Sequence, residues 1–310
     1  HGDNQVTNLC NRSYVRELLE KYSLSPKKAF GQNFLINPGV PMEIASLSAG
    51  YAKRGKPSAV LEIGPGVGAL TQYLCEEYDK VVAVEIDRGL IPLLGEALAE
   101  FDNVTVVEGD FMKLDLPSFI EEHFSDILAK GGSIGVCANL PYYITTPVIM
   151  KLLESFPDRE RLPFASIVVM VQLEVARRLA AKAGSADYGS ISASIALRAN
   201  AEKLLDVSAG NFHPVPKVAS AVVGIIPHGG VREVYKDAPD DIAKFTEDVV
   251  DVISLAFGQR RKTFLNAVSG KYSKDKTQSV LEELGIRPDV RGEVLSAEDF
   301  CRITDKLRQK

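Results

Sequence analysis

The sequence reads AVLEIGPGVG from Ala59 to Gly68, a short apolar run that leads into a glycine-rich turn. The run predicts a buried strand over residues 59–63, and the residues from Ala69 onward predict a helix. Glycines let the backbone turn tightly and approach a ligand closely, and a following helix start adds N–H donors. The spacing G-x-G-x-G differs from the G-x-G-x-x-G of dinucleotide binders. By itself the turn is therefore only a weak indication of a nucleotide-type cofactor.

Strand-like and helix-like segments alternate on both sides of this turn. Several of the strand-like runs are continuously apolar, which is typical of a parallel sheet covered on both faces. We therefore predict an α/β fold with a Rossmann-like sheet. The strands are expected at 59–63, 80–86, 104–107, 133–138, 165–171, 203–207 and 219–226, and helices at 12–22, 69–78, 88–101, 146–155 and 174–183.

The last quarter of the chain lacks strand-like runs. It follows the linker-like segments 228–230 and 237–240, and its spacing predicts helices at 242–257, 261–268, 277–284 and 297–309. We predict two domains: residues 1–237, an α/β domain with an N-terminal helical and loop extension, and residues 238–310, a small all-helical domain.

The composition narrows the functional classes. Hydrophobic residues make up 45% of the 310 residues. The net charge is −5, and this negative charge argues against a protein that coats nucleic acid without specificity. No apolar run reaches the ~18 residues of a membrane span, and no signal peptide is recognisable. The four cysteines are scattered and the histidines do not cluster, so we expect no metal site. We expect a cytoplasmic protein that has no membrane partner and acts as a monomer.

Two carboxylates are predicted at the same edge of the sheet as the glycine turn. Glu85 ends the second strand, 21 residues after Gly64, where an acidic residue can bind ribose hydroxyls. Asp110 follows the third strand, where it either accepts a hydrogen bond from an adenine amine or caps a segment that starts at Phe111. No Lys or Arg pattern for phosphates accompanies the turn, so S-adenosylmethionine fits better than NAD or ATP.

A second motif, Asn139-Leu140-Pro141-Tyr142, follows the fourth strand. Its amide oxygen and the Leu140 carbonyl can accept hydrogen bonds from an exocyclic amine, and the tyrosine ring can stack on an extruded base. A simple turn with a packed aromatic ring explains the four residues equally well. Phe212, in a proline-rich loop, is either a packing anchor or a second stacking surface.

Taken together, these motifs resemble the small-subunit ribosomal RNA adenine N6,N6-dimethyltransferase family. The similarity runs from about residue 26 to the C-terminus. It rests on the glycine turn, the 139–142 motif and the segments FGQNFL (30–35), EID (85–87), QLEVARR (172–178), YGSIS (188–192), FHPVPKVAS (212–220) and RGE (291–293). Leu173 departs from the usual lysine of its segment.

The resemblance implies a class I methyltransferase sheet and S-adenosylmethionine as methyl donor, with S-adenosylhomocysteine as product. Its substrate would be two adjacent adenines in the 3′-terminal hairpin loop of 16S rRNA, in an immature 30S particle. Asn139, Leu140, Pro141, Tyr142 and Phe212 would then form the catalytic site. The expected cofactor residues are Gln32, Asn33, Leu35, Gly64, Gly66, Glu85, Ile86, Asp110, Phe111 and Asn139.

A basic cluster, Arg260-Arg261-Lys262, is expected to meet rRNA phosphates, although such a cluster is often only a solvated face.

Three other functions of the chain stay open. Erythromycin-resistance enzymes methylate one adenine of large-subunit rRNA on the same core, and a ribosome-assembly or transcription factor could keep the fold without needing catalysis. A DNA N6-adenine methyltransferase shares the 139–142 motif but not the other matches.

Overall fold

The computed structural model describes residues 8–25, 34–157, 159, 161–259 and 261–309. The chain forms two compact units. The first comprises His1–Ile149, Pro163–Ala176 and Lys203–Gly224, and the second comprises Met150–Leu162, Arg177–Glu202 and Ile225–Lys310. The boundary expected after residue 237 stays a prediction.

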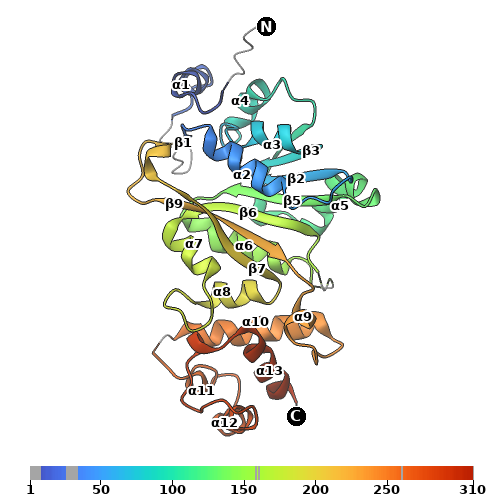
Figure 1. Cartoon of the computed structure of the whole chain (residues 1–310), viewed down its shortest axis with the longest axis vertical. Coiled ribbons are helices and arrows are strands. Elements are labelled where there is room, and N and C mark those ends of the chain that lie inside the picture. The colour runs from blue at the N-terminus through green and yellow to red at the C-terminus, as the bar shows by residue number, and fades with distance from the viewer. Residues whose placement is uncertain (1–7, 26–33, 158, 160, 260, 310) are drawn as a thin grey trace. The chain divides into compact units, whose positions relative to one another are not determined.

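A seven-stranded sheet has the strand order β4-β3-β2-β5-β6-β9-β7 (Figure 1). The neighbours from β4 to β6 pair in parallel, as their apolar runs predicted. The chain leaves β2 in one direction, toward β3 and β4, and later returns to the other side of β2 with β5. In open parallel sheets ligands bind beyond the strand ends at such a reversal. The strands are β2 (Ser58–Ile63), β3 (Lys80–Glu85), β4 (Val104–Glu108), β5 (Ser133–Asn139), β6 (Phe164–Gln172), β7 (Ala199–Val207) and β9 (Ser220–Pro227).

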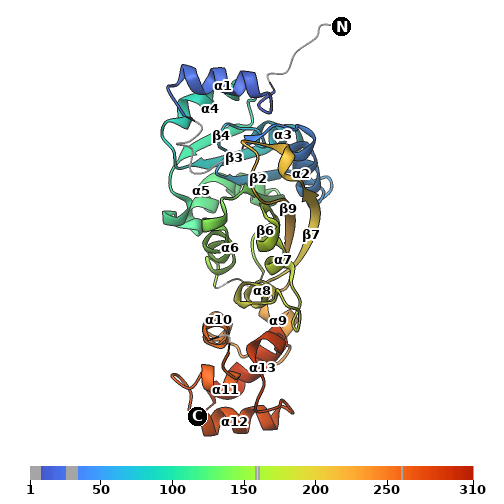
Figure 2. The same cartoon turned by 90° about the vertical axis from the view of Figure 1, so that its left-hand side faces the viewer.

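Helices cover both faces of the parallel part of the sheet (Figure 2). One face packs against α2 (Gly39–Ala49), α3 (Thr71–Glu77) and α4 (Leu90–Ala97), whose buried side chains share one core cluster with Val60, Val81 and Cys137. The helix α5 (Leu116–Ala129) packs on the other face, against β2 and β5. The predicted α/β class is therefore confirmed. The sequence reading placed no helix at 116–129, so α5 was missed.

The first unit also contains α1 (Arg12–Lys21) and a second, small sheet. In that sheet β1 (Phe34–Leu35) pairs antiparallel with β8 (Phe212–His213). Leu35 lies opposite Phe212, and Phe34 lies opposite His213. This ladder joins two segments that are far apart in the sequence.

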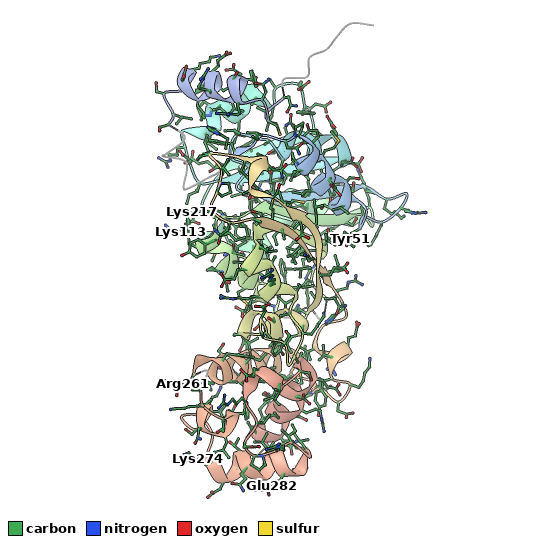
Figure 3. All side chains as sticks on the ribbon, turned by 60° about the vertical axis from the view of Figure 1, so that its left-hand side comes forward. Tyr51, Lys113, Lys217, Arg261, Lys274 and Glu282 are labelled. Atoms are coloured by element: carbon green, nitrogen blue, oxygen red, sulfur yellow. The ribbon has the colours of Figure 1, made fainter. Side chains whose placement is uncertain are left out.

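The second unit has its own core of aromatic residues, among them Phe245, Phe264 and Phe300. From residue 242 to 309 its described residues contain helices and no strand, as predicted. Figure 3 labels Arg261, Lys274 and Glu282 on this part of the chain. Its helices include α8 (Ser190–Ala196), α9 (Val231–Val234), α10 (Ile242–Gly258), α11 (Phe264–Ala267), α12 (Lys274–Glu283) and α13 (Ala297–Arg308). Two further helices, α6 (Thr145–Glu154) and α7 (Leu173–Ala180), are divided between the two units.

All four cysteines are buried, and none forms a disulfide. Burial raises the thiol pKa of Cys10, Cys75 and Cys137 to about 12, and burial also raises the pKa of the Cys301 thiol. Within the described ranges, no helix combines the length and the apolar character needed to cross a bilayer.

Candidate functional site

A pocket of about 370 Å³ lies in the first unit at the carboxyl ends of β2, β5 and β6. This is the edge at which the strand order reverses. Most of the residues predicted from the sequence meet here. The predicted residues in its wall are Leu35, Gly64, Gly66, Asn139, Leu140, Pro141, Tyr142 and Phe212.

The glycine turn forms one side of this pocket. Gly64, Gly66 and Gly68 have φ angles of 69°, 60° and 94°, which are left-handed values that disfavour residues with a Cβ. At Gly64 an added Cβ would meet no atom within 4 Å, so open space lies beside it. The turn therefore leaves room for a ligand to approach the backbone.

Glu62 lines the same pocket and is only 2% exposed. Desolvation raises the pKa of its carboxyl from 4.5 to about 8, although a hydrogen bond from the Thr71 hydroxyl, 2.6 Å from Oε2, acts in the opposite direction. No cation pairs with Glu62 among the described residues. Near neutral pH this carboxyl therefore keeps its proton, and a positively charged ligand beside it would favour the ionised form. The sequence reading gave Glu62 no role, although an acidic residue inside an apolar strand was a usable signal.

Glu85 lies under the glycine turn, not in the pocket wall. Its Oε2 accepts the Gly66 N–H at 3.1 Å, and its Oε1 accepts the Asp87 N–H at 2.9 Å. The carboxyl is 1% exposed, and desolvation raises its pKa. Glu85 therefore holds the turn in place, and its contact with a ribose stays a prediction.

Asp110 caps a short 3₁₀ turn, Phe111–Lys113, through a hydrogen bond from the Met112 N–H to its Oδ1, at 2.9 Å. This is one of the two roles that the sequence allowed. Phe111 is buried, and Ile86 is 49% exposed. None of these three residues lines the pocket, so their cofactor contacts stay predictions.

The 139–142 motif also lines the pocket, at the end of the strand next to β2. Asn139 ends β5 beside Met170 of β6, and its side-chain amide has no hydrogen-bond partner among the residues that the structure describes. Tyr142 is 65% exposed, so its ring is not the packed aromatic of a simple turn. The next residue, Tyr143, also lines the pocket and is 56% exposed.

Phe212 is held by the β1–β8 ladder. Its side chain is 4% exposed and belongs to the core cluster, yet it also lines the pocket. The structure thus shows the packing role that the sequence allowed, and stacking on a base stays a prediction. Leu35, opposite Phe212, is brought into the pocket by the same ladder.

Several predicted residues lie elsewhere. Gln32, Asn33 and Arg260 fall outside the described residues. Arg261 and Lys262 are exposed in the second unit. The described residues contain no group of three or more His, Cys, Asp or Glu side chains placed to hold a metal ion. Sequence reasoning missed further pocket residues from β6 and its surroundings, namely Met170, Val171, Val218 and Ser220.

Comparisons with known proteins agree with this architecture. Residues 24–309 match the family described as "Ribosomal RNA adenine dimethylase". The chain is 40% identical over 298 residues to the ribosomal RNA small subunit methyltransferase A of Anoxybacillus flavithermus, with 94% of each chain covered. It is 41% identical over 300 residues to the protein of the same name from Shouchella clausii, covering 94% of this chain and 92% of that protein.

Among solved structures, a dimethyladenosine transferase from Plasmodium falciparum superposes with a TM-score of 0.65 at 25% identity, covering 86% of this chain and 94% of that one. The 23S rRNA methyltransferase ErmE superposes with a TM-score of 0.62 at 23% identity, covering 89% and 100%. The second likeness concerns the fold alone. These similarities confirm the Rossmann-like methyltransferase sheet expected from the sequence.

Proposed function

The chain belongs to the ribosomal RNA adenine dimethylase family, and we propose that it transfers methyl groups from S-adenosylmethionine to N6 of two adjacent adenines. The proposed adenines lie in the 3′-terminal hairpin loop of 16S rRNA, and each receives two methyl groups. The observation that carries the proposal is that the glycine turn and the 139–142 motif line one and the same pocket. The names of the small-subunit relatives support the choice of substrate.

The donor set of the pocket fits S-adenosylmethionine. The open space beside Gly64 suits a close approach to the backbone, and Glu62, which meets no cation among the described residues, would be ionised more readily beside a cationic ligand. When bound, the cofactor supplies an electrophilic methyl group on a sulfonium sulfur. We propose that Leu35, Gly64 and Gly66 contact it directly and that Glu85 and Asp110 bind its nucleoside part beside Ile86 and Phe111. Gln32 and Asn33, which lie outside the described residues, are proposed as further cofactor-binding residues from the family resemblance alone.

Side-chain and backbone groups of the 139–142 motif position the target base. Asn139 Oδ1 and the Leu140 carbonyl accept the two hydrogens of the adenine N6 amine, which turns the nitrogen lone pair toward the methyl donor. Tyr142 stacks on the extruded base, and Phe212 supports it from the β1–β8 ladder. No nucleophilic side chain or strong base is required, because the proton can leave to water after transfer. Catalysis then rests on positioning and electrostatics.

The test is methyl transfer from labelled S-adenosylmethionine to unmethylated small subunits, to large subunits and to DNA in separate reactions, followed by mapping of the labelled bases. We expect label in two adjacent N6,N6-dimethyladenines of the 3′-terminal hairpin. Label confined to large-subunit rRNA would move the enzyme to the erythromycin-resistance type. Cofactor binding without label in either subunit would favour an assembly factor, and label in DNA alone would favour a DNA methyltransferase.

We also propose the setting in which the enzyme acts. Its partner would be small-subunit rRNA within an immature 30S particle, where methylation accompanies subunit maturation. The protein would act as a monomer in the cytoplasm. Co-sedimentation with precursor but not with mature 30S particles would support this setting, and equal binding to both would contradict it.

A further inference from the structure

The helix α1 carries two arginines that no part of the proposed mechanism uses. It lies outside residues 24–309, the region matched by the family. Val15, Leu18 and Leu19 bury one side of α1 in the core of the first unit. Arg12 and Arg16, one turn apart, remain exposed on another side.

These arginines face a second pocket, of about 570 Å³, which is within the usual size of ligand sites. Its other wall is the ladder formed by β1 and β8, including Phe34, Leu35 and His213. Phe34 and Leu35 also line the methyl-transfer pocket. The two pockets therefore share part of a wall at β1, which Figure 1 shows near α1.

The charges in the second pocket select an anion. A guanidinium nitrogen of Arg12 lies 3.1 Å from His213 Nε2. Because a guanidinium only donates, the histidine nitrogen accepts this bond, and Arg12 is thereby held against β8. Arg16 meets Glu20 at 3.9 Å, but both side chains are 71% exposed, so that pair is weak. No carboxylate lines the pocket in the part of the chain that the structure describes. The wall of this pocket is therefore positively charged, although the chain as a whole has a net charge of −5.

We infer that this pocket binds the nucleotide next to the target adenine, with Arg12 and Arg16 on its phosphate. The inference rests on the proposed function. An extruded base stays tied to its neighbours by phosphodiester links, so the neighbouring phosphate must lie close to the mouth of the target pocket. Guanidinium groups bind phosphate oxygens through paired hydrogen bonds. Arg12 and Arg16 are positioning residues here, since neither touches the reacting atoms.

The test compares wild-type enzyme with the double variant Arg12→Gln/Arg16→Gln. The charge-matched control is Arg54→Gln/Lys56→Gln, in the exposed loop before β2, at the amino edge of the parallel sheet. Binding of an unmethylated 3′-terminal hairpin RNA is measured by fluorescence anisotropy from low to high salt. The log–log salt slope of the Arg12/Arg16 variant should fall by about 0.7 to 0.9 per lost phosphate contact. The slope of the control should not change.

Kinetics on small subunits give a second readout. A phosphate contact stabilises ground state and transition state equally, so the KM for RNA should rise about tenfold or more while kcat and S-adenosylmethionine affinity stay near wild type. A wild-type slope and KM in the double variant, or equal losses in the control, would overturn the inference and leave the proposed function intact. Failure of wild-type enzyme to methylate small subunits would overturn the proposed function. In that case the salt dependence of binding to the hairpin RNA would still test the phosphate contact independently.

Discussion

Asn139 combines a position in the pocket wall with a side-chain amide that has no partner among the described residues. Replacing it with alanine should lower kcat by about 10²- to 10³-fold, the cost of removing one well-placed polar group from a transition state. Cofactor affinity, measured by calorimetry, should change little. A large loss of affinity with normal turnover would assign Asn139 to the cofactor instead.

Glu62 should make the stability of the protein depend on pH. Its carboxyl pKa is about 8 when folded and about 4.5 when free in solution, so the folded chain holds the extra proton between these values. The stabilisation is complete below about pH 4.5 and is lost as the pH rises through 8, with a slope of at most about 1.4 kcal/mol per pH unit. Glu62→Gln should remove this slope. Urea unfolding from pH 5 to 9 tests it, and parallel profiles for both proteins would contradict it.

Tyr142 and Tyr143 provide a matched pair, because both line the pocket and both are more than half exposed. If Tyr142 stacks on the target base, Tyr142→Ala should weaken the apparent binding of small subunits by about 1–3 kcal/mol. Tyr143→Ala should have a smaller effect, and both variants should unfold near the wild-type temperature. The reverse order of effects would move the stacking role to Tyr143.

Predictability differs among single residues for physical reasons. The pocket position of Asn139 was expected from its place after a strand, whereas the sequence left Tyr142 either packed in a turn or free to stack, and only the structure shows that its ring is exposed. The sequence allowed two roles each for Asp110, a helix cap or a ligand contact, and for Phe212, a packing anchor or a stacking surface. Only the surrounding three-dimensional packing can distinguish these roles. Glu85 illustrates the same limit, because its two backbone hydrogen bonds depend on how the glycine turn folds back over it.

Among the elements, β5 contains a glycine that the packing requires. An added Cβ at Gly135 would lie 2.7 Å from the Tyr78 hydroxyl, which is itself bonded to Ser48 at 2.6 Å. Gly135→Ala should destabilise the fold by about 1–3 kcal/mol. The control is Gly95→Ala on the exposed side of α4, where an added Cβ meets nothing and alanine should stabilise by about 0.5–1 kcal/mol. Chemical denaturation of both variants measures the contrast, and equal effects would refute the packing argument.

The elements near the glycine turn were predictable because their apolar spacing is strong and local. The helix α5 also carried a signal, with Asp115 as its N-cap and buried residues at helical spacing, but the sequence reading did not use it. The β1–β8 ladder carried no such signal. It consists of two-residue strands from distant parts of the chain, so its pairing is a product of the tertiary fold.

On the scale of the whole molecule, the net charge of −5 requires RNA contacts to be local. If Arg261 and Lys262 meet rRNA phosphates, Arg261→Gln/Lys262→Gln should lower the salt slope of small-subunit binding by about 1.4 to 1.8. Lys236→Gln/Lys274→Gln, which removes two other exposed charges of the same unit, should leave the slope unchanged. An unchanged slope in the first variant would show that the cluster is a solvated face.

The burial of all four thiols has a practical consequence. Maleimide dyes and spin labels react with thiolates, and in this chain burial both shields the sulfur atoms and keeps them protonated near neutral pH. A cysteine introduced at an exposed site in each unit would therefore react with such labels, and the four buried cysteines would not have to be replaced. Such a doubly labelled protein could report, by energy transfer, how the distance between the units changes when the enzyme docks on a ribosomal particle.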